Sequence, residues 1–391
     1  MKVRGRVYKA LAWLSAAVLV GACSEEAASS SADVKTAVDT AGTDATASDT
    51  SSGDSGSGGS DGASLADAAD IAADSGADAS ASDTASSDSD SGATADSSSD
   101  AAVDTGVDTF VPQPLTGQWA ELPSASTNTL HAIWGASLDQ IWAVGEQGAI
   151  VRCDGSTWNA VPSPTFQWLQ GIWGASPTDI WAVGTSGTVV HYDGNAWSKV
   201  DAGTTDSLYA ISGSGKDDIW AVGTAGLVLH KTAAGWKTVK VGSDAFLYSV
   251  WANSPSDVWI GGGQGTLLHY DGSAWSKIDA KVTGTIEGLF GFGAKDVWAA
   301  GQNGALLHWD GTAWTQASGI ADKPYLFRVW GATATDVWAS GNFGELWHFD
   351  GAQWQKVDAK TGEHLRGLWG ASGKNVWLVG PAKSSFHYVA P

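Results

Sequence analysis

A unit of about 39 residues is repeated along most of this chain of 391 residues. Each copy contains Asp-Ile-Trp or a close variant, whose tryptophan recurs at positions 142, 181, 220, 259, 298, 338 and 377. The steps are 39, 39, 39, 39, 40 and 39 residues, so there are seven units. A fixed period of this length is typical of repeat architectures, in which each unit buries its apolar face against its neighbours.

Each unit has the pattern of four short strands. In the second unit we expect them at residues 169–174, 179–184 and 188–194 and around Trp197. Gly, Asn, Asp and Ser separate the strands, and no segment has a helical period long enough to compete. Four-stranded units at this period predict an all-β fold, a β-propeller.

A second tryptophan series indicates how the propeller closes. It marks the fourth strand at positions 158, 197, 236, 275, 314 and 354, and the seventh unit has no such tryptophan. Trp119 lies 39 residues before Trp158, in register with the series. We therefore predict that residues 113–391 form a seven-bladed propeller whose last blade takes its outer strand from the N-terminal segment.

The N-terminus has the pattern of a secretion signal. Four basic residues and no acidic one precede or border the apolar run at positions 10–20, which is short for a membrane span. The sequence Val-Gly-Ala-Cys that ends at Cys23 resembles the lipobox of bacterial lipoproteins. That resemblance implies a signal peptide at 1–22, lipidation of Cys23 and, from Ser24 at the next position, sorting to the outer membrane.

Residues 23–112 are nearly all Ala, Ser, Asp, Gly and Thr. They cannot bury enough apolar surface to offset the entropy of ordering, so we expect a disordered spacer. Of the total charge of −21, the signal carries +4 and the spacer −18, which leaves −7 for the remainder. This acidity argues against nucleic acid as a partner.

The repeated elements resemble those of known propellers. The segments Asp-Ile-Trp-Ala-Val-Gly at 179–184 and His-Tyr-Asp-Gly-Asn-Ala-Trp at 191–197 are similar to YCF48-like and Asp-box repeats, and more loosely to tectonin-type lectin repeats. The resemblance covers residues 117–391 and implies the propeller fold. Such propellers include lectins, assembly factors and glycosidases, so fold alone does not give function. An Asp box has one residue between Asp and Gly, whereas Asp193 and Gly194 are adjacent, so its chemistry is not carried over.

Most shared positions are predicted to be structural. An Asp before the second strand recurs, and Asp favours tight turns; the members are Asp179, Asp218, Asp257, Asp296 and Asp336, with Asn375 last. A His in the third strand recurs, and we expect it to pack and hydrogen-bond between blades, since residues spread around a ring cannot converge on one metal ion; the members are His191, His230, His269, His308, His348 and His387. The tryptophans are expected to fill the wedges between sheets. One alternative stays open, in which repeat-equivalent tryptophans bind one sugar per wedge.

The positions that differ between copies are the candidates for function. The connections from fourth to first strand and from second to third strand vary most, and binding sites favour such loops on a rigid scaffold. The most variable position is one residue into the first strand; its occupants are His131, Gln170, Tyr209, Tyr248, Glu287, Phe327 and Arg366. We predict that these seven side chains rim one ligand pocket suited to a sugar or a peptide segment. The alternative is a neutral surface position.

No catalytic constellation is recognisable. A sialidase requires three convergent arginines, but of the three in residues 113–391, Arg152 lies in a third strand away from Arg328 and Arg366. Glu287 alone does not provide the carboxylate pair of a glycosidase. We predict no catalytic residue, no cofactor and no metal site. The sequence favours a monomeric, membrane-anchored binding module for glycans or envelope components, then a protein-assembly scaffold, and last a propeller glycosidase or lyase.

Overall fold

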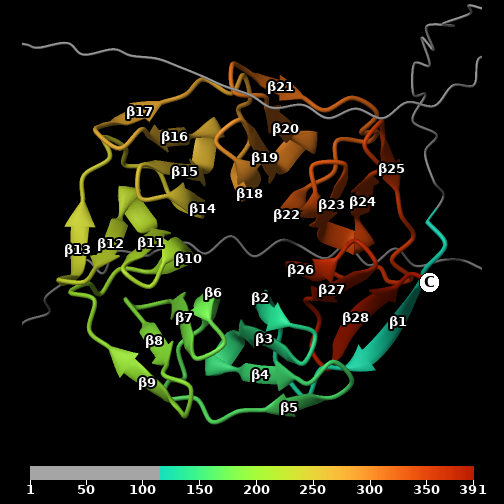
Figure 1. The fold of residues 1–391 in the computed structure, drawn as a ribbon, viewed down its shortest axis with the longest axis horizontal. Coiled ribbons are helices and arrows are strands. Elements are labelled where there is room, and N and C mark those ends of the chain that lie inside the picture. Colours follow the sequence, from blue (N-terminus) through green and yellow to red (C-terminus); the bar gives the residue numbers. More distant parts are fainter. Residues whose placement is uncertain (1–114) are drawn as a thin grey trace, which may run out of the picture. The chain divides into compact units, whose positions relative to one another are not determined.

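The structure is a computed structural model that describes residues 115–391. These residues form seven four-stranded antiparallel sheets arranged in a ring, as Figure 1 shows. The predicted all-β, seven-bladed propeller is therefore confirmed. The predicted signal peptide, the lipidation site Cys23 and the whole of the predicted spacer lie outside the described residues.

The blades are numbered in chain order, and each begins at the central channel (Figure 1). The innermost strands are β2 (Leu130–Ser137), β6 (Leu169–Ser176), β10 (Leu208–Gly215), β14 (Leu247–Ser254), β18 (Ile286–Gly293), β22 (Leu326–Thr333) and β26 (Gly367–Ser372). The second strands are β3 (Gln140–Gly145), β7 (Asp179–Gly184), β11 (Asp218–Gly223), β15 (Asp257–Gly262), β19 (Asp296–Gly301), β23 (Asp336–Gly341) and β27 (Asn375–Val379).

The outer half of each blade follows the same order. The third strands are β4 (Ile150–Cys153), β8 (Val189–Tyr192), β12 (Val228–Thr232), β16 (Leu267–Tyr270), β20 (Leu306–Trp309), β24 (Leu346–Phe349) and β28 (Ser384–Val389). The fourth strands are β5 (Trp158–Ala160), β9 (Trp197–Val200), β13 (Gly235–Val239), β17 (Trp275–Lys277), β21 (Trp314–Gln316) and β25 (Trp354–Lys356), with β1 (Gln118–Pro123) completing the last blade.

Short 3-10 turns connect second to third strands in five blades: η1 (Glu146–Gly148), η2 (Thr224–Gly226), η3 (Gly263–Gly265), η4 (Gln302–Gly304) and η5 (Asn342–Gly344). Their middle residues have left-handed backbone, for example Asn303 with φ 59° and Phe343 with φ 52°. The last residue must be glycine, because a Cβ on Gly344 would lie 2.0 Å from the backbone oxygen of Thr361 in the loop to the next blade. The turns and the fourth-to-first loops therefore share one face of the ring, the loop face.

The ring is closed as the Trp119 register predicts. Strand β1 pairs antiparallel with β28, from Gln118 opposite Val389 to Pro123 opposite Ser384. In Figure 1 the first described strand lies beside the last strand of the chain. The last blade therefore joins both ends of the described region. Every blade has its fourth strand, so no third strand is left with an unpaired edge.

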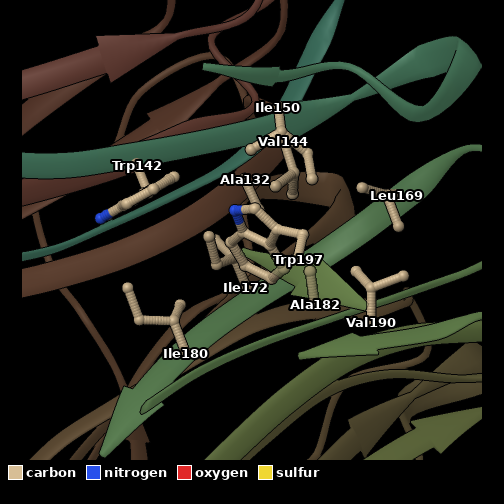
Figure 2. Packing of buried hydrophobic residues seen from close by; sticks show 10 residues of the cluster. All are labelled: Ala132, Trp142, Val144, Ile150, Leu169, Ile172, Ile180, Ala182, Val190 and Trp197. Atoms are coloured by element: carbon tan, nitrogen blue, oxygen red, sulfur yellow. The ribbon is translucent and has the colours of Figure 1, made fainter. Parts of the chain in front are cut away.

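Tryptophans fill every wedge between neighbouring blades. The second-strand Trp of one blade meets the fourth-strand Trp of the next edge to face, with ring centroids 5.3–5.9 Å apart and interplanar angles of 72–84°. Figure 2 shows one wedge, where Trp142 and Trp197 lie among aliphatic side chains of blades 1 and 2. The second strands are buried on both faces, so they are continuously apolar. The predicted wedge packing is confirmed.

Two predictions about shared residues were wrong in detail. The Asp side chains do not cap turns, and the third-strand His residues do not bond between blades: each His Nε2 lies 2.7–2.9 Å from the Asp of its own blade, with 3.2 Å for His387 to Asn375. The register explains this. His191 pairs opposite Trp181 and stacks on it at 4.0 Å, and Asp179 lies two residues before Trp181, on the same face of its strand. The hydrogen-bonded and stacked Asp, His and Trp residues therefore form a network within one blade.

Five tryptophans of the described region line the channel and each packs on a glycine of the next blade, while in blade 5 the ring that meets the next glycine, Gly331, is that of Phe292. A Cβ on Gly174 would lie 2.5 Å from the Trp134 indole, and one on Gly135 2.6 Å from Trp369. The pattern is broken between blades 3 and 4, where Ser212 of blade 3 replaces the aromatic ring and Ala252 of blade 4 replaces the glycine facing it. There the Ser212 hydroxyl accepts a hydrogen bond from the Ala252 N–H at 3.3 Å.

Candidate functional site: a pocket at the loop face

The variable first-strand side chains lie together. All seven predicted ligand-binding residues line one pocket of about 280 Å³ at the loop-face end of the channel. A cavity of about 330 Å³ in the channel below shares Tyr209, Tyr248, Glu287 and Arg328 with it. The structure thus brings these residues to one place, because the starts of the seven inner strands converge on the channel mouth. Their role in binding stays a prediction.

His131 and Gln170 form a pair on one side of the pocket. The His131 Nδ1 lies 2.6 Å from the Gln170 side-chain oxygen. The His131 Nε2 is buried without a hydrogen bond in the described residues, and the Glu146 carboxylate lies 3.7 Å from it. Burial lowers the pKa of His131, so the ring is neutral at pH 7.

Two tyrosine rings form the next sector of the wall, and a phenylalanine ring lies beside them. Tyr209 and Tyr248 stack with centroids 5.2 Å apart, and Phe246 lies 6.5 Å from each. Neither tyrosine hydroxyl has a hydrogen-bond partner among residues 115–391. Burial raises the pKa of both hydroxyls, so they are donors at neutral pH.

Among residues 115–391, Glu287 is the only acidic residue that lines this pocket. Its carboxylate accepts a hydrogen bond from the Tyr325 hydroxyl. Burial raises the pKa of Glu287, although the Tyr325 hydrogen bond and the nearby arginines oppose the shift. The guanidinium of Arg328 donates to the backbone oxygens of Glu287 at 3.1 Å and Phe327 at 3.0 Å, so it is held in the wall.

Arg366 differs from Arg328 because its guanidinium is free. It lies over the Phe327 ring at 5.4 Å and makes no hydrogen bond or ion pair within the described residues. Burial is the main cause of the lowered pKa values of His131 and His364, and the positive charge of Arg366 lowers them further. The pocket therefore contains one fixed and one free guanidinium.

A second variable position, just before the first strand, was missed by the sequence reasoning. Its occupants are Thr129, Trp168, Ser207, Phe246, Thr285, Tyr325 and His364. Each large member contacts the rim residue of the preceding blade: Trp168 meets His131 at 5.9 Å, Phe246 meets Tyr209, Tyr325 bonds Glu287, and His364 meets Phe327 at 6.1 Å. The signal was present in the sequence, as large aromatic residues that alternate with Thr or Ser at one repeat position.

Arg328 was also missed as a pocket residue. The same repeat position holds Ala, Gly or Ser in the other six blades, because it faces the backbone of the next blade. A Cβ on Gly171, for example, would lie 3.1 Å from the Ala210 Cα. One arginine among six small residues breaks the repeat and could have identified this position.

Exposed aromatic side chains surround the pocket on the loop face. Among the described residues, the strongly exposed Phe and Trp side chains are Phe166 (90%), Phe343 (72%), Phe246 (48%) and Trp168 (45%). All four belong to fourth-to-first loops or to a second-to-third turn. On the opposite face, which carries the first-to-second turns, the large exposed apolar residues of the described region are Leu138, Val389 and Leu115, and none of them is aromatic. The two faces are therefore chemically different.

No catalytic arrangement is evident in the described part of the chain. Glu287 has no second carboxylate beside it in the pocket, and residues 115–391 contain no group of three or more His, Cys, Asp or Glu placed to hold a metal ion. No helix within residues 115–391 is long and apolar enough to cross a membrane.

Comparison with known proteins places the chain by fold alone. No protein-family model matches it, and no curated protein matches it. Among solved structures it is similar to YCF48 bound to a D1 peptide, with 17% identity and TM-score 0.59 over 72% of this chain and 98% of that one. It is also similar to virginiamycin B lyase from Staphylococcus aureus (11%, TM-score 0.62, 70% and 100%) and to the WD40 propeller of Doa1 (8%, TM-score 0.58, 70% and 97%). The resemblance to YCF48 expected from the repeats is thus confirmed at the level of the propeller.

Proposed function

We propose that this chain is a non-catalytic binding module that captures a protein segment on the loop face, with part of the segment seated in the rim pocket. The observation that carries the proposal is the convergence of seven side chains of six kinds, at repeat-equivalent positions, on one pocket. Positions under purely structural demand hold the same residue in most blades, as the wedge tryptophans do. The pocket is where the copies differ most.

The exposed aromatic residues favour a protein over a glycan, which reverses the order expected from the sequence. Phe166 and Phe343 are 90% and 72% exposed, and aromatic side chains are enriched in the cores of protein interfaces. Three of the four exposed aromatic residues are phenylalanines, which supply apolar contact area but no polar group that could hydrogen-bond the hydroxyls of a sugar. Of the similar structures, one contains YCF48 with a D1 peptide, which shows that a propeller of this shape can hold a peptide.

The N-terminal sequence supports a location. We propose that Cys23 is lipidated and that residues 23–112 hold the propeller away from a bacterial outer membrane, as a monomer. Changing Cys23→Ser should move the protein from the membrane to the soluble fraction. Persistence of the variant in the membrane fraction would contradict the anchor.

Site-specific photocrosslinking tests the binding face. A photoreactive amino acid at Phe343 is expected to give discrete protein adducts in cells, and the same group at Leu138, exposed on the opposite face, should not. The adducts should disappear when Tyr209 and Tyr248 are both changed to Ala, since the segment then loses its aromatic contacts in the pocket. Equal adducts from both faces would refute the proposal.

A glycan array with the purified protein tests the second candidate. Binding that the Tyr209→Ala, Tyr248→Ala double variant abolishes, without any crosslinked protein, would favour a glycan ligand at the same pocket. The stacked Tyr209 and Tyr248 are the observation behind this candidate, because sugars commonly pack on such rings.

A further inference from the structure

We propose that the rim pocket selects a segment that carries a carboxylate, and that Arg366 is the residue that binds this group. The inference rests on the proposed capture of a protein segment and names the chemistry that the pocket would read. It depends on the donors left without partners and on the side chains that surround them.

The groups facing the pocket are mostly unpaired donors. The Arg366 guanidinium, the hydroxyls of Tyr209 and Tyr248 and the Gln170 amide nitrogen have no hydrogen-bond partner among residues 115–391. The Gln170 oxygen is already engaged by His131, and the Glu287 carboxylate by Tyr325. A donor-rich, acceptor-poor cavity is complementary to an anion, since unpaired donors that a ligand buries without partners cost free energy.

The outer variable position explains why Arg366 is available. Four rim residues are contacted by a large side chain from the next blade, as described above. The blade after Arg366 supplies only Thr129 at that position, and those after Gln170 and Tyr248 supply Ser207 and Thr285. Arg366, whose guanidinium is free, is thus one of the three rim residues with a small neighbour in the next blade. A small neighbour leaves room beside the rim residue for a ligand.

The charge of the pocket is opposite to that of the rest of the chain. Two guanidinium groups line it against one carboxyl group whose pKa burial raises. The region that forms the propeller has a net charge of −7, and the spacer before it carries −18. An acidic segment would be repelled by most of the molecule and attracted at this pocket, so the local charge contributes specificity.

The geometry of Arg366 suits a carboxylate. Its guanidinium carbon lies 5.4 Å from the centroid of the Phe327 ring, and this cation–π contact uses none of the N–H groups in a hydrogen bond. A guanidinium edge binds a carboxylate through two parallel hydrogen bonds, which a lysine cannot reproduce. Arg366→Lys should therefore weaken binding, although it keeps the charge.

Ligand-observed NMR with two matched small probes tests this reading on the purified protein. N-acetylglutamate should show saturation transfer, and its neutral isostere N-acetylglutaminamide, in which both carboxyl groups are amides, should bind at least about tenfold more weakly, which corresponds to 1.4 kcal/mol. Arg366→Gln should abolish the signal of the acid and Arg366→Lys should reduce it. Lys374→Gln serves as the control: it removes an exposed charge away from the pocket, where the Lys374 ammonium donates to the Pro391 backbone oxygen. This variant should leave the signal of the acid unchanged.

Each alternative result has a meaning. Equal binding of acid and amide, no binding of the acid, or binding that survives Arg366→Gln would overturn the inference. Competition by inorganic phosphate equal to that by N-acetylglutamate would also overturn it, since the pocket would then be a general anion site. Saturation by N-acetylneuraminate but not N-acetylglutamate would assign the carboxylate to a sugar.

The inference and the proposed function fail separately. If the Phe343 crosslink to a protein survives unchanged in the Arg366→Gln protein, the capture of a protein segment stands and the carboxylate reading is wrong. If no crosslink forms but N-acetylglutamate binds through Arg366, the binding chemistry stands and the protein partner is wrong.

Discussion

Closure of the ring through Trp119 can be tested against an internal control. Trp119 on β1 packs against Trp338 at 5.9 Å and Tyr388 at 5.2 Å, and these contacts attach the first described strand to the last wedge. Trp197 has the equivalent place in the wedge between blades 1 and 2, at 5.6 Å from Trp142. The two tryptophans differ in that β1 comes from the other end of the chain.

The expected loss for Trp119→Ala follows from this packing. Truncating a fully buried tryptophan costs about 3–5 kcal/mol, and Trp119 is half-buried, so we expect about 2–4 kcal/mol. For a domain of this size that lowers Tm by about 4 to 8 °C. Trp197→Ala should cost somewhat more, because Trp197 is only 7% exposed.

The distinguishing result is local. In Trp119→Ala, β1 should detach from β28 before the rest unfolds, so limited proteolysis should cut near residues 118–123 under native conditions. Trp197→Ala should unfold with no such early cut, because β9 is joined in sequence to β8 of its own blade and to β10 of the next, whereas β1 has no sequence connection to β28. An unchanged melting temperature and unchanged protection of residues 118–123 in Trp119→Ala would refute the closure argument.

Three further predictions follow from single contacts. Ser212→Trp should destabilise the protein by about 1–3 kcal/mol, because the indole would meet the Ala252 methyl. Adding Ala252→Gly should recover most of this loss, as measured by urea unfolding. If the effects of the two substitutions on the free energy of unfolding simply add, the ring packing is contradicted. Burial raises the pKa of Glu287, so the folded state holds this proton up to a higher pH than the unfolded state does. The free energy of unfolding of the wild type, relative to that of Glu287→Gln, should therefore fall as pH rises from below 4.5 to 7. A difference in unfolding free energy that stays constant with pH would contradict the burial. Cys153 is fully buried and burial raises its pKa to about 11, so a thiol reagent should label it only at the rate of unfolding, and fast labelling of the folded protein would contradict its place in the core.

Repeat spacing was sufficient to predict the propeller because each blade packs only on its neighbours. The period gave the number of blades, and Trp119, in register with the later series, gave the closing strand. The same spacing gave the converging rim, from His131 to Arg366, since equivalent positions of seven inner strands must meet at the channel. These features follow from local strand patterns and ring symmetry, which a sequence contains.

The contacts between side chains required the tertiary structure. The partner of each third-strand histidine is the residue two before the facing Trp, which is an Asp in five blades and Asn375 in the last, and strand register decides that pairing. The split between the fixed Arg328 and the free Arg366 depends on which backbone oxygens and which neighbouring blade lie within reach.

The sequence by itself determined the repeat, the seven blades, the closing strand and the set of variable positions, because these depend on the order of residues along the chain. Only the tertiary structure decided which of those positions are covered by the next blade and which donors stay unpaired. That is a matter of distances between residues about 39 apart or more in sequence, and it is where the chemistry of the pocket arises.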